Sequence, residues 1–172
     1  LLAGIKKDRL NNDVIYLSGS KGDSTAEIAL LWSTAYDNKI LSFANTLHTI
    51  DGGTHEQAFR QTVTRVVNKY AHDFKKIKES SDNLKGDDIL EGLVAVVSVK
   101  LSDAQFESQT KNKLGNTDAK NAVDEVFNLE AQRYFDKNVE VLKRILENVH
   151  KSFKARTASD KARKTVMKQL LD

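Results

Sequence analysis

The sequence predicts an α+β fold: a sheet of about four strands with helices packed on one face and a long helix at the C-terminal end. Two patterns predict this class. Apolar residues alternate with a two-residue period between residues 14 and 50, whereas they recur every three or four positions after residues 54, 117 and 139. The chain has 172 residues, 40% of them hydrophobic and 30% charged, which is enough for one globular domain with its own core.

Four segments are predicted as strands. DVIYLSGS and AEIALLW are separated by the turn formers SKGDS, and ILSFANTLHTI follows as a third strand. The apolar residues of the second strand share one face: Ala26, Ile28, Leu30 and Trp32. In the third strand, Phe43 and Leu47 are expected on the face of Leu41. The fourth strand, LVAVVSVKL, is apolar almost throughout and is expected to be buried on both faces.

Helical periodicity follows two glycines, Gly52 and Gly53. Thr54 is a plausible N-cap, with Gln57 completing a capping box, and one face carries an apolar stripe: Phe59, Val63, Val66, Tyr70 and Phe74. LKGDDILEGL predicts a loop with a short, aspartate-capped helix. Asn116 or Thr117 is expected to cap the next helix, whose inner face contains Val123, Phe127, Ala131 and Tyr134 or Phe135.

The last predicted helix starts near Val139 and continues to the C-terminus without glycine or proline. Its apolar side contains Leu142, Ile145, Leu146, Val149 and Phe153. A helix of this length measures roughly 50 Å, more than the core needs, so its end is expected to project toward another domain. Between Lys143 and Lys168, nine basic side chains stand against two acidic ones, a net of +7 in a chain of net +3. Such a segment indicates either an anionic neighbour, most often nucleic acid, or a solvated helix face.

Composition excludes several classes of protein. The chain has no cysteine, so it has no disulfide framework and no thiolate metal site, which favours a reducing, cytoplasmic setting. No apolar run approaches the ~20 residues of a membrane helix. His55 is expected to belong to a helix start, and no metal site is predicted, because no pair among the other histidines has ligand spacing with an acidic partner: His48, His72 and His150. The chain begins without methionine and is expected to be a fragment of a longer protein.

Three strings together closely resemble the transducer domain in the ATPase component of bacterial type IIA topoisomerases, most like that of DNA gyrase B. They are SFANTLHTIDGGTHEQAFRQTVTR (42–65), LKGDDILEGLVAVVSVKLSDAQFESQTKNKLGN (84–116) and the basic terminal helix. The resemblance covers nearly the whole chain. Three features depart from the family pattern. The family usually has aspartate-proline before the phenylalanine of this loop, where this chain has Asp103-Ala104-Gln105-Phe106; Ala58 replaces a frequent glycine, and the terminal helix carries fewer arginines.

The resemblance implies a fold like the second domain of ribosomal protein S5, with a left-handed β-α-β crossover. It implies that residues 1–172 form a single transducer domain, with a body of about residues 1–138 and a long helix of about residues 139–172. It further implies part of an ATP-hydrolysing DNA topoisomerase, an isomerase, in which a preceding GHKL-type ATP-binding domain supplies the Mg²⁺ ligands. The isolated fragment is expected to be inactive. The implied partners are double-stranded DNA, the ATPase domain of the same chain, the gyrase A protein in an A2B2 heterotetramer, and a second copy of gyrase B when ATP is bound.

The resemblance also assigns roles to particular residues. Gln109 and Lys111, in the string Q-T-K, would touch the terminal phosphate of ATP in the neighbouring domain, with Lys111 also acting in catalysis. A lysine ammonium carries three donors on a long stem, and a glutamine amide adds a donor without charge. Arg60 matches a position facing the cavity for the transported DNA duplex, and Arg65 and Lys69 could extend that strip. The plain alternatives are a solvated loop lysine and a solvated helix face.

Other functions share parts of this pattern. The ATPase component of topoisomerase IV has a similar transducer and serves decatenation, whereas gyrase introduces negative supercoils; GDDILEGL and KLGN favour gyrase. An independent nucleic-acid-binding module of the ribosomal type would need a basic or aromatic sheet surface, and these strands carry few basic residues. A related GHKL ATPase of mismatch repair or chaperone action is disfavoured by the ordered G-G-T-H and Q-T-K strings.

Overall fold

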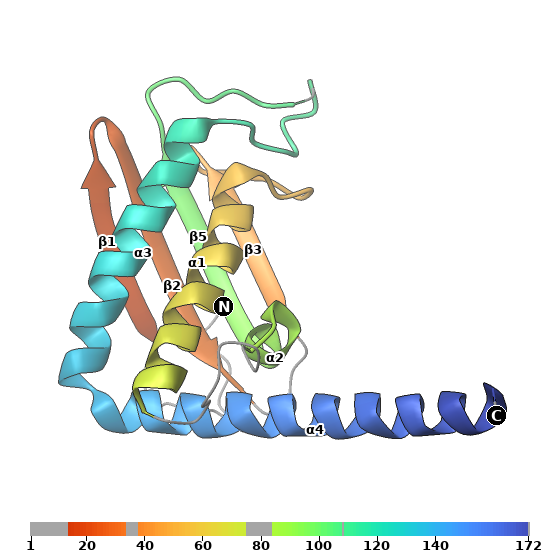
Figure 1. Cartoon of the computed structure of the whole chain (residues 1–172). Coiled ribbons are helices and arrows are strands. Elements are labelled where there is room, and N and C mark those ends of the chain that lie inside the picture. Colours follow the sequence, from red (N-terminus) through yellow and green to blue (C-terminus); the bar gives the residue numbers. More distant parts are fainter. Residues whose placement is uncertain (1–13, 34–37, 75–83, 108, 172) are drawn as a thin grey trace.

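A mixed sheet in the order β1-β2-β5-β3-β4 is the frame of the protein (Figure 1). The computed structural model describes residues 14–33, 38–74, 84–107 and 109–171. The strands are β1 (Ile15–Lys21), β2 (Ser24–Trp32), β3 (Lys39–Ala44), β4 (Leu47–His48) and β5 (Leu93–Lys100). β2 pairs antiparallel with β1 and β5, while β3 pairs parallel with β5 and antiparallel with β4. The predicted α+β class is confirmed.

The third predicted strand is in fact a hairpin, so the sheet has five strands rather than about four. Asn45 and Thr46 have φ values of 48° and 69°, the left-handed backbone that a tight two-residue turn requires. The Asn45 side chain fixes the turn by bonding the N–H and the C=O of Leu101, at 2.7 and 3.0 Å. Because the chain reverses there, Leu47 pairs with Ala44 and shares the face of Ala44, so the expectation that Leu47 lies on the face of Leu41 is wrong. Leu47 is exposed and Leu41 is only half-buried.

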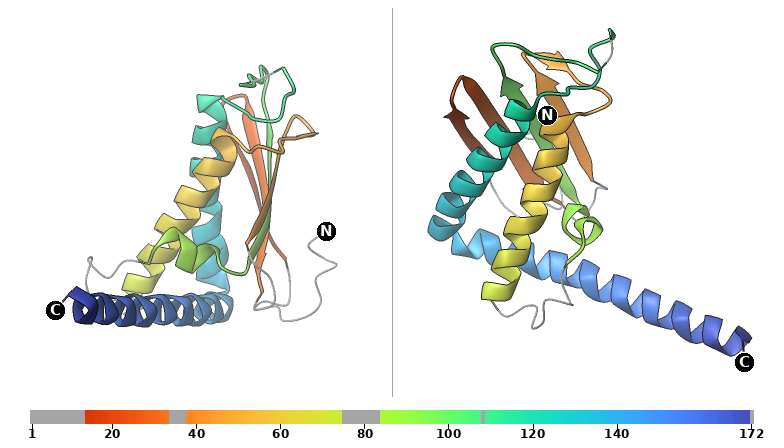
Figure 2. Two further views of the ribbon diagram at one scale, coloured as in Figure 1. Left: turned by 90° about the vertical axis from the view of Figure 1, so that its right-hand side faces the viewer. Right: turned by 45° about the horizontal axis from the view of Figure 1, so that its top comes forward.

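The core lies between the sheet and two helices, α1 (Thr54–Asp73) and α3 (Thr117–Lys137), which cover one face (Figure 2). The predicted inner face of β2 is fully buried: Ala26, Ile28, Leu30 and Trp32. Phe59 of α1 and Phe127 of α3 meet edge to face with ring centroids 5.6 Å apart. The expectation that β5 is buried on both faces holds only for its first three residues. Val96 and Ser98 are half-buried, because none of the helices in the described residues covers their side of the sheet.

The connection from β3 to β5 has the uncommon hand. The chain passes from β3 through β4, α1 and α2 (Gly86–Leu90) to β5, which is parallel to β3. In Figure 1 the helices lie in front of the sheet and β5 lies to the left of β3, so this β-α-β crossover is left-handed. The general rule is right-handed in about 98% of cases, so this expectation came from the family resemblance alone and the structure agrees with it.

Two helix starts differ from the predicted caps. Gly53 precedes α1, and Thr54 is its first residue, whose Oγ1 donates to the Asn116 carbonyl at 2.6 Å. The predicted capping box of Thr54 and Gln57 is therefore wrong. Asn116 does precede α3, but its side chain binds the adjacent loop rather than the helix. Phe74 lies just beyond α1 and is exposed, whereas the other residues of the predicted α1 stripe are buried.

The long helix α4 (Val139–Leu171) runs beneath the body and then projects well beyond it (Figure 1). Its first turns bury the predicted side chains: Leu142, Ile145, Leu146 and Val149. Phe153 is half-buried, and beyond Asp160 every described side chain is exposed. The predicted length and projection are confirmed.

An ion pair fastens α4 to α2 where the helix leaves the body. The Asp88 carboxylate accepts from Lys85 N–H at 2.8 Å. Lys85 is the N-cap of α2 and Asp88 its third residue, so the aspartate acts from within the first turn rather than as the predicted N-cap. The same carboxylate accepts two bonds from Arg156, from Nε at 2.9 Å and from a terminal nitrogen at 3.1 Å. The side chain of Asp88 is 2% exposed and that of Arg156 is 24% exposed. Arg156 also lies 3.5 Å from Asp160 and over the Phe153 ring. Arg156 is thus a structural residue within the basic segment.

Arg156→Gln is expected to lower the free energy of unfolding by about 2 kcal/mol, because it strands a buried carboxylate. The effect should fall below the ~3–5 kcal/mol of a fully buried pair, since Arg156 is partly exposed. Urea unfolding measures the change. Lys143→Gln is the matched control, because its partner Glu140 lies at 3.7 Å on an exposed surface. That variant should change the free energy of unfolding by less than ~0.5 kcal/mol. Equal losses of stability in the two variants would show that the Asp88–Arg156 ion pair does not stabilise the fold.

Candidate functional site

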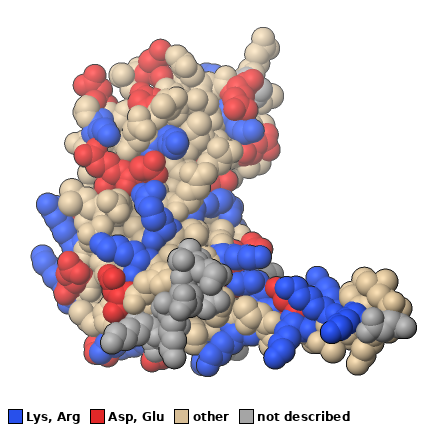
Figure 3. All heavy atoms as spheres, in the orientation of Figure 1, with Lys and Arg blue, Asp and Glu red and all other residues tan. Residues whose placement is uncertain are grey.

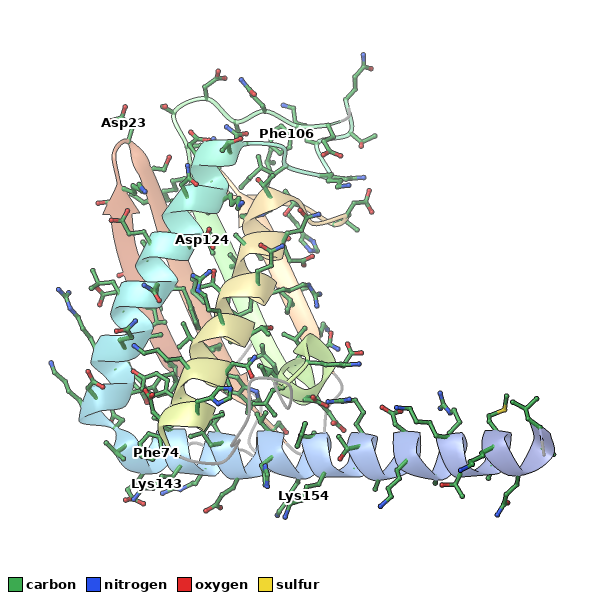
Figure 4. The ribbon with its side chains drawn as sticks, in the orientation of Figure 1. Asp23, Phe74, Phe106, Asp124, Lys143 and Lys154 are labelled. Atoms are coloured by element: carbon green, nitrogen blue, oxygen red, sulfur yellow. The ribbon has the colours of Figure 1, made fainter. Side chains whose placement is uncertain are left out.

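The loop between β5 and α3, residues 101–116, folds back on itself as a narrow hairpin. Phe106 bridges Leu114 in antiparallel fashion, and the Glu107 N–H donates to the Lys113 carbonyl at 2.9 Å. The Gly115 N–H donates to the Gln105 carbonyl at 2.8 Å. Phe106 packs against the core at the base of the hairpin (Figure 4). The tip of the hairpin, which carries Gln109, Thr110 and Lys111, therefore stands out from the end of the sheet (Figure 1).

The hairpin is joined by main-chain bonds to the segment that leads into α1. Leu114 is fully buried and bridges Gly53 in parallel fashion. The Leu114 N–H donates to the Gly52 carbonyl, and the Thr54 N–H donates to the Leu114 carbonyl, both at 3.1 Å. The Asp51 N–H donates to the Asn112 carbonyl at 2.9 Å. The base of the hairpin is thus bonded to the residues that lead into the first turn of α1.

Glycine is required where these two segments meet. Gly53 has φ 143° and ψ −166°, a region that is essentially open to glycine alone. A Cβ on Gly53 would lie 2.4 Å from the Leu114 carbonyl oxygen and 2.6 Å from its nitrogen. The predicted backbone bend at the two glycines is confirmed, and its purpose is the close approach of residue 114.

Asn116 closes the other side of the hairpin. Its Oδ1 accepts from the Gln105 N–H at 2.6 Å, and its Nδ2 donates to the Asp103 carbonyl at 2.8 Å. This side chain is buried. Its two bonds hold the stretch between Asp103 and Gln105. Sequence reasoning identified Asn116 only as a helix cap. Its role in the loop depends on contacts that span 11 and 13 residues.

The hairpin tip presents polar side chains to the outside. Gln109 and Lys111 are both exposed, and Lys111 has φ 59°, a value that non-glycine residues seldom adopt. No acidic group among the described residues lies within ion-pair distance of Lys111, whereas Lys113 pairs with Glu107 at 3.2 Å. The structure thus brings Gln109 and Lys111 together on one rigidly based tip. An ammonium beside an amide is suited to bind an oxyanion, such as a phosphate, presented by another domain or molecule.

His55 is buried beneath this site and belongs to α1, as expected. Its Nε2 lies 3.0 Å from Thr49 Oγ1, the Thr49 hydroxyl donates to Ser42 Oγ at 2.8 Å, and the Ser42 hydroxyl donates to the Thr49 carbonyl. Since Thr49 gives its proton to Ser42, we assign the neutral His55 tautomer that donates from Nε2. Burial lowers the pKa of His55 to about 4. The described residues include no group of three or more His, Cys, Asp or Glu that could hold a metal.

His55 should make stability depend on pH between about 6.5 and 4. The unfolded chain binds a proton near pH 6.5, while the folded chain keeps His55 neutral down to about pH 4. Stability is therefore complete above pH 6.5 and declines as the pH falls, by about 2 kcal/mol at pH 5. Urea unfolding between pH 5 and 7 measures this. The His55→Gln variant should lack this part of the slope, and an unchanged slope would contradict the assignment.

The three basic residues predicted on α1 do not form a single strip. Arg60 is half-buried, with Nε 3.8 Å from the Glu56 carboxylate. Burial raises the pKa of Glu56, and Arg60 opposes that shift. Arg65 and Lys69 are exposed and one turn apart. Five residues of helix turn the direction by about 140°, so Arg65 and Lys69 point away from the side that carries Arg60.

Within the described ranges, no helix has the length and apolar character that a membrane-spanning segment needs.

Comparison with solved structures gives the class of the fold. The 43K ATPase domain of Thermus thermophilus gyrase B, solved in complex with an aminocoumarin, superposes with a TM-score of 0.85 at 35% identity, covering 95% of this chain and 44% of that one. The topoisomerase IV ATP-binding domain of Francisella tularensis, solved with a small-molecule inhibitor, gives a TM-score of 0.72 at 26% identity, covering 86% and 41%. The fold is thus that of part of a bacterial topoisomerase ATPase region.

The sequence comparison gives the family. The family model of DNA gyrase B matches residues 2–165. The DNA gyrase B protein of Mycobacterium tuberculosis is 44% identical over 163 residues, which cover 95% of this chain and 24% of that protein. The chain belongs to the DNA gyrase B family, and it spans about a quarter of the length of the relatives that it matches.

Proposed function

We propose that this chain is the transducer domain of a gyrase-type topoisomerase, comprising a body of about residues 1–138 and a lever, α4. Residues 1–13 of that body lie outside the described part. In this proposal the chain couples ATP hydrolysis in a preceding ATP-binding domain to DNA strand passage. The observation that carries the proposal is the hairpin tip, which holds Gln109 and Lys111 outside the body on a base bonded to α1. The proposal is supported by the Thermus ATPase-domain structure, of which this chain matches only 44%, so that structure includes a further portion that could serve as the partner domain.

The tip would act as a sensor of the terminal phosphate of ATP. The Lys111 ammonium reaches that phosphate in the neighbouring domain, and the Gln109 amide donates a second hydrogen bond. A charge-assisted bond of ~1.5–3 kcal/mol shifts an equilibrium between two domain arrangements by roughly ten- to a hundred-fold. The bond is lost with the phosphate, so hydrolysis reverses the shift. The same ammonium stabilises the charge of the transferred phosphoryl group.

A continuous path would carry this shift to the lever. The hairpin bonds to the first turn of α1, α1 packs beside α2, and the Asp88–Arg156 pair holds α2 to α4. The Mg²⁺ that accompanies ATP belongs to the neighbouring domain in this proposal. The proposed partners are double-stranded DNA, the gyrase A protein in an A2B2 assembly, and a second copy of the whole ATPase protein in the ATP-bound state. The isolated chain should hydrolyse no ATP.

Negative supercoiling is the proposed outcome. The matching family model is that of DNA gyrase B, and the DNA gyrase B proteins of Mycobacterium tuberculosis and Streptococcus pneumoniae are 44% and 42% identical to this chain. This likeness supports the gyrase reaction over the decatenation performed by topoisomerase IV.

Hydrogen exchange in the full-length protein tests the sensor. The amides of residues 109–112 should be protected when a non-hydrolysable ATP analogue is bound and should exchange freely when ADP is bound. Equal exchange in the two complexes would contradict a contact that depends on the terminal phosphate.

Arg60→Gln is expected to weaken DNA-stimulated ATP hydrolysis and strand passage several-fold more than intrinsic hydrolysis. Loss of a single phosphate contact should also reduce the salt dependence of DNA binding by about one unit of slope. Arg65→Gln, on another side of α1, is the matched control. Equal losses of stimulated and intrinsic hydrolysis in Arg60→Gln would indicate instead a packing role through Glu56.

A further inference from the structure

The charges of α4 are divided between two sides of the helix. On the side continuous with the buried stripe, Arg156 is paired with Asp88 and Asp160. The side that faces away from the body carries lysines, as Lys143 and Lys154 show in Figure 4. Lys154, Lys161 and Lys168 recur every seven residues, and Lys143 precedes Lys154 by eleven. Both spacings return to nearly the same direction on a helix. We call these four residues the outer row: Lys143, Lys154, Lys161 and Lys168.

The outer row is not neutralised beyond its first member. Lys143 has Glu140 at 3.7 Å, but no acidic group among the described residues lies within ion-pair distance of Lys154, Lys161 or Lys168. Asp160 is the one acidic residue between positions 148 and 171, and its carboxylate forms an ion pair with Arg156. Figure 3 accordingly shows basic side chains gathered over the projecting part of α4.

Helix stability does not account for this row. Cations stabilise the C-terminal end of a helix only within its last turn. Lys168 meets that condition, but Lys154 and Lys161 lie several turns before Leu171. Lysines in a row along the projecting part of α4 are instead suited to bind a linear polyanion, whose negative charges also lie in a row.

We propose that the outer row is a second DNA-binding surface, separate from Arg60, which contacts the backbone of a duplex without reading its sequence. It rests on the proposed function only in taking duplex DNA as the polyanion. Lys143 and Lys168 are 25 residues apart, so the row is roughly 37 Å long. That length matches about one turn of duplex DNA, ~34–36 Å, and phosphates line its entire surface. α4 would thus hold a duplex against the side of the lever that faces away from the body.

Fluorescence anisotropy with a labelled duplex tests the surface on the 172-residue chain. The variant K154Q/K161Q/K168Q should lose at least about ten-fold in affinity at ~50 mM salt, and the slope of log K against log salt should fall by about 2 to 3. Glutamine preserves helix propensity at these exposed positions, which circular dichroism checks. The variant K154R/K161R/K168R should keep the binding, because it keeps the charge.

The matched control removes the same charge from the body. K100Q/K120Q/K137Q replaces three exposed lysines, none of which has an ion pair among the described residues. This control should lose less than about a third of the slope that the outer-row variant loses. Equal losses in the two variants, or no loss in the outer-row variant, would overturn the proposal. Binding of the chain to phosphatidylserine vesicles, with outer-row variants losing vesicle binding but not DNA binding, would also overturn it in favour of a membrane surface. None of these outcomes depends on ATP turnover, which tests the sensor separately.

Discussion

Lys111→Ala in the full-length protein should lower ATP turnover at least about a hundred-fold while leaving the affinity for ADP within a few-fold. Loss of a single positioned donor to a developing negative charge commonly costs ~10²–10³ in rate. ADP lacks the phosphate that Lys111 would contact, so its binding should be spared. The assays are steady-state hydrolysis and a direct measurement of ADP binding. The change is local, because Lys111 is exposed and has no ion pair among the described residues.

Lys113→Ala is the control for the loss of Lys111. Lys113 lies on the same hairpin, but its ammonium pairs with Glu107 at 3.2 Å. This variant should keep turnover within about three-fold of the wild type, since an exposed ion pair contributes only ~0–1 kcal/mol. If the Lys111 variant hydrolysed ATP at the wild-type rate, Lys111 would be a solvated loop lysine and the sensor would be wrong.

Gly53→Ala should lower the free energy of unfolding by at least about 3 kcal/mol and should separate the hairpin from α1. Alanine resists the backbone of Gly53, at a cost of ~1–3 kcal/mol, and its Cβ would overlap two backbone atoms of Leu114. Relief of that overlap requires the Gly53–Leu114 bridge to open. In the full-length protein, turnover should therefore fall even though Gly53 is not in contact with the nucleotide.

Gly22→Ala is the matched control for Gly53. Gly22 also has a positive φ, of 60°, but a Cβ there would meet nothing within 4 Å. The expected cost is only about 1 kcal/mol, from the left-handed backbone alone. Urea unfolding of both variants gives the comparison. A Gly53 variant no less stable than the Gly22 variant would show that the close approach of Leu114 is not required.

Periodicity predicted the parts of the fold that depend on local sequence. The two-residue period of β2 identified its buried face, and the three-to-four-residue periods identified most of the buried face of α1 and the buried faces of α3 and α4. The hairpin at Asn45 and Thr46 escaped detection, because its turn lacks the glycine that commonly marks such turns and depends on bonds to Leu101. The side of the sheet that the described helices cover could not be predicted either, because helix placement is a property of the tertiary fold.

The residues of the candidate site could be proposed from the sequence, but their geometry could not. Gln109 and Lys111 were selected through the family resemblance, since spacing alone would have left Lys111 as a surface residue. The bonds that fix the hairpin join residues about 60 positions apart, such as Thr54 with Leu114 and Asn116. Arg156 would be grouped with its basic neighbours from the sequence, yet it binds Asp88, which is 68 residues away. Such contacts leave no local signature.

A structure of the full-length protein with a non-hydrolysable ATP analogue tests the central claim most directly. We expect the Lys111 Nζ at about 3 Å from an oxygen of the terminal phosphate, with the Gln109 amide as a second donor. A complex in which the phosphate is bound by the ATP-binding domain alone, with Lys111 in solvent, would contradict it.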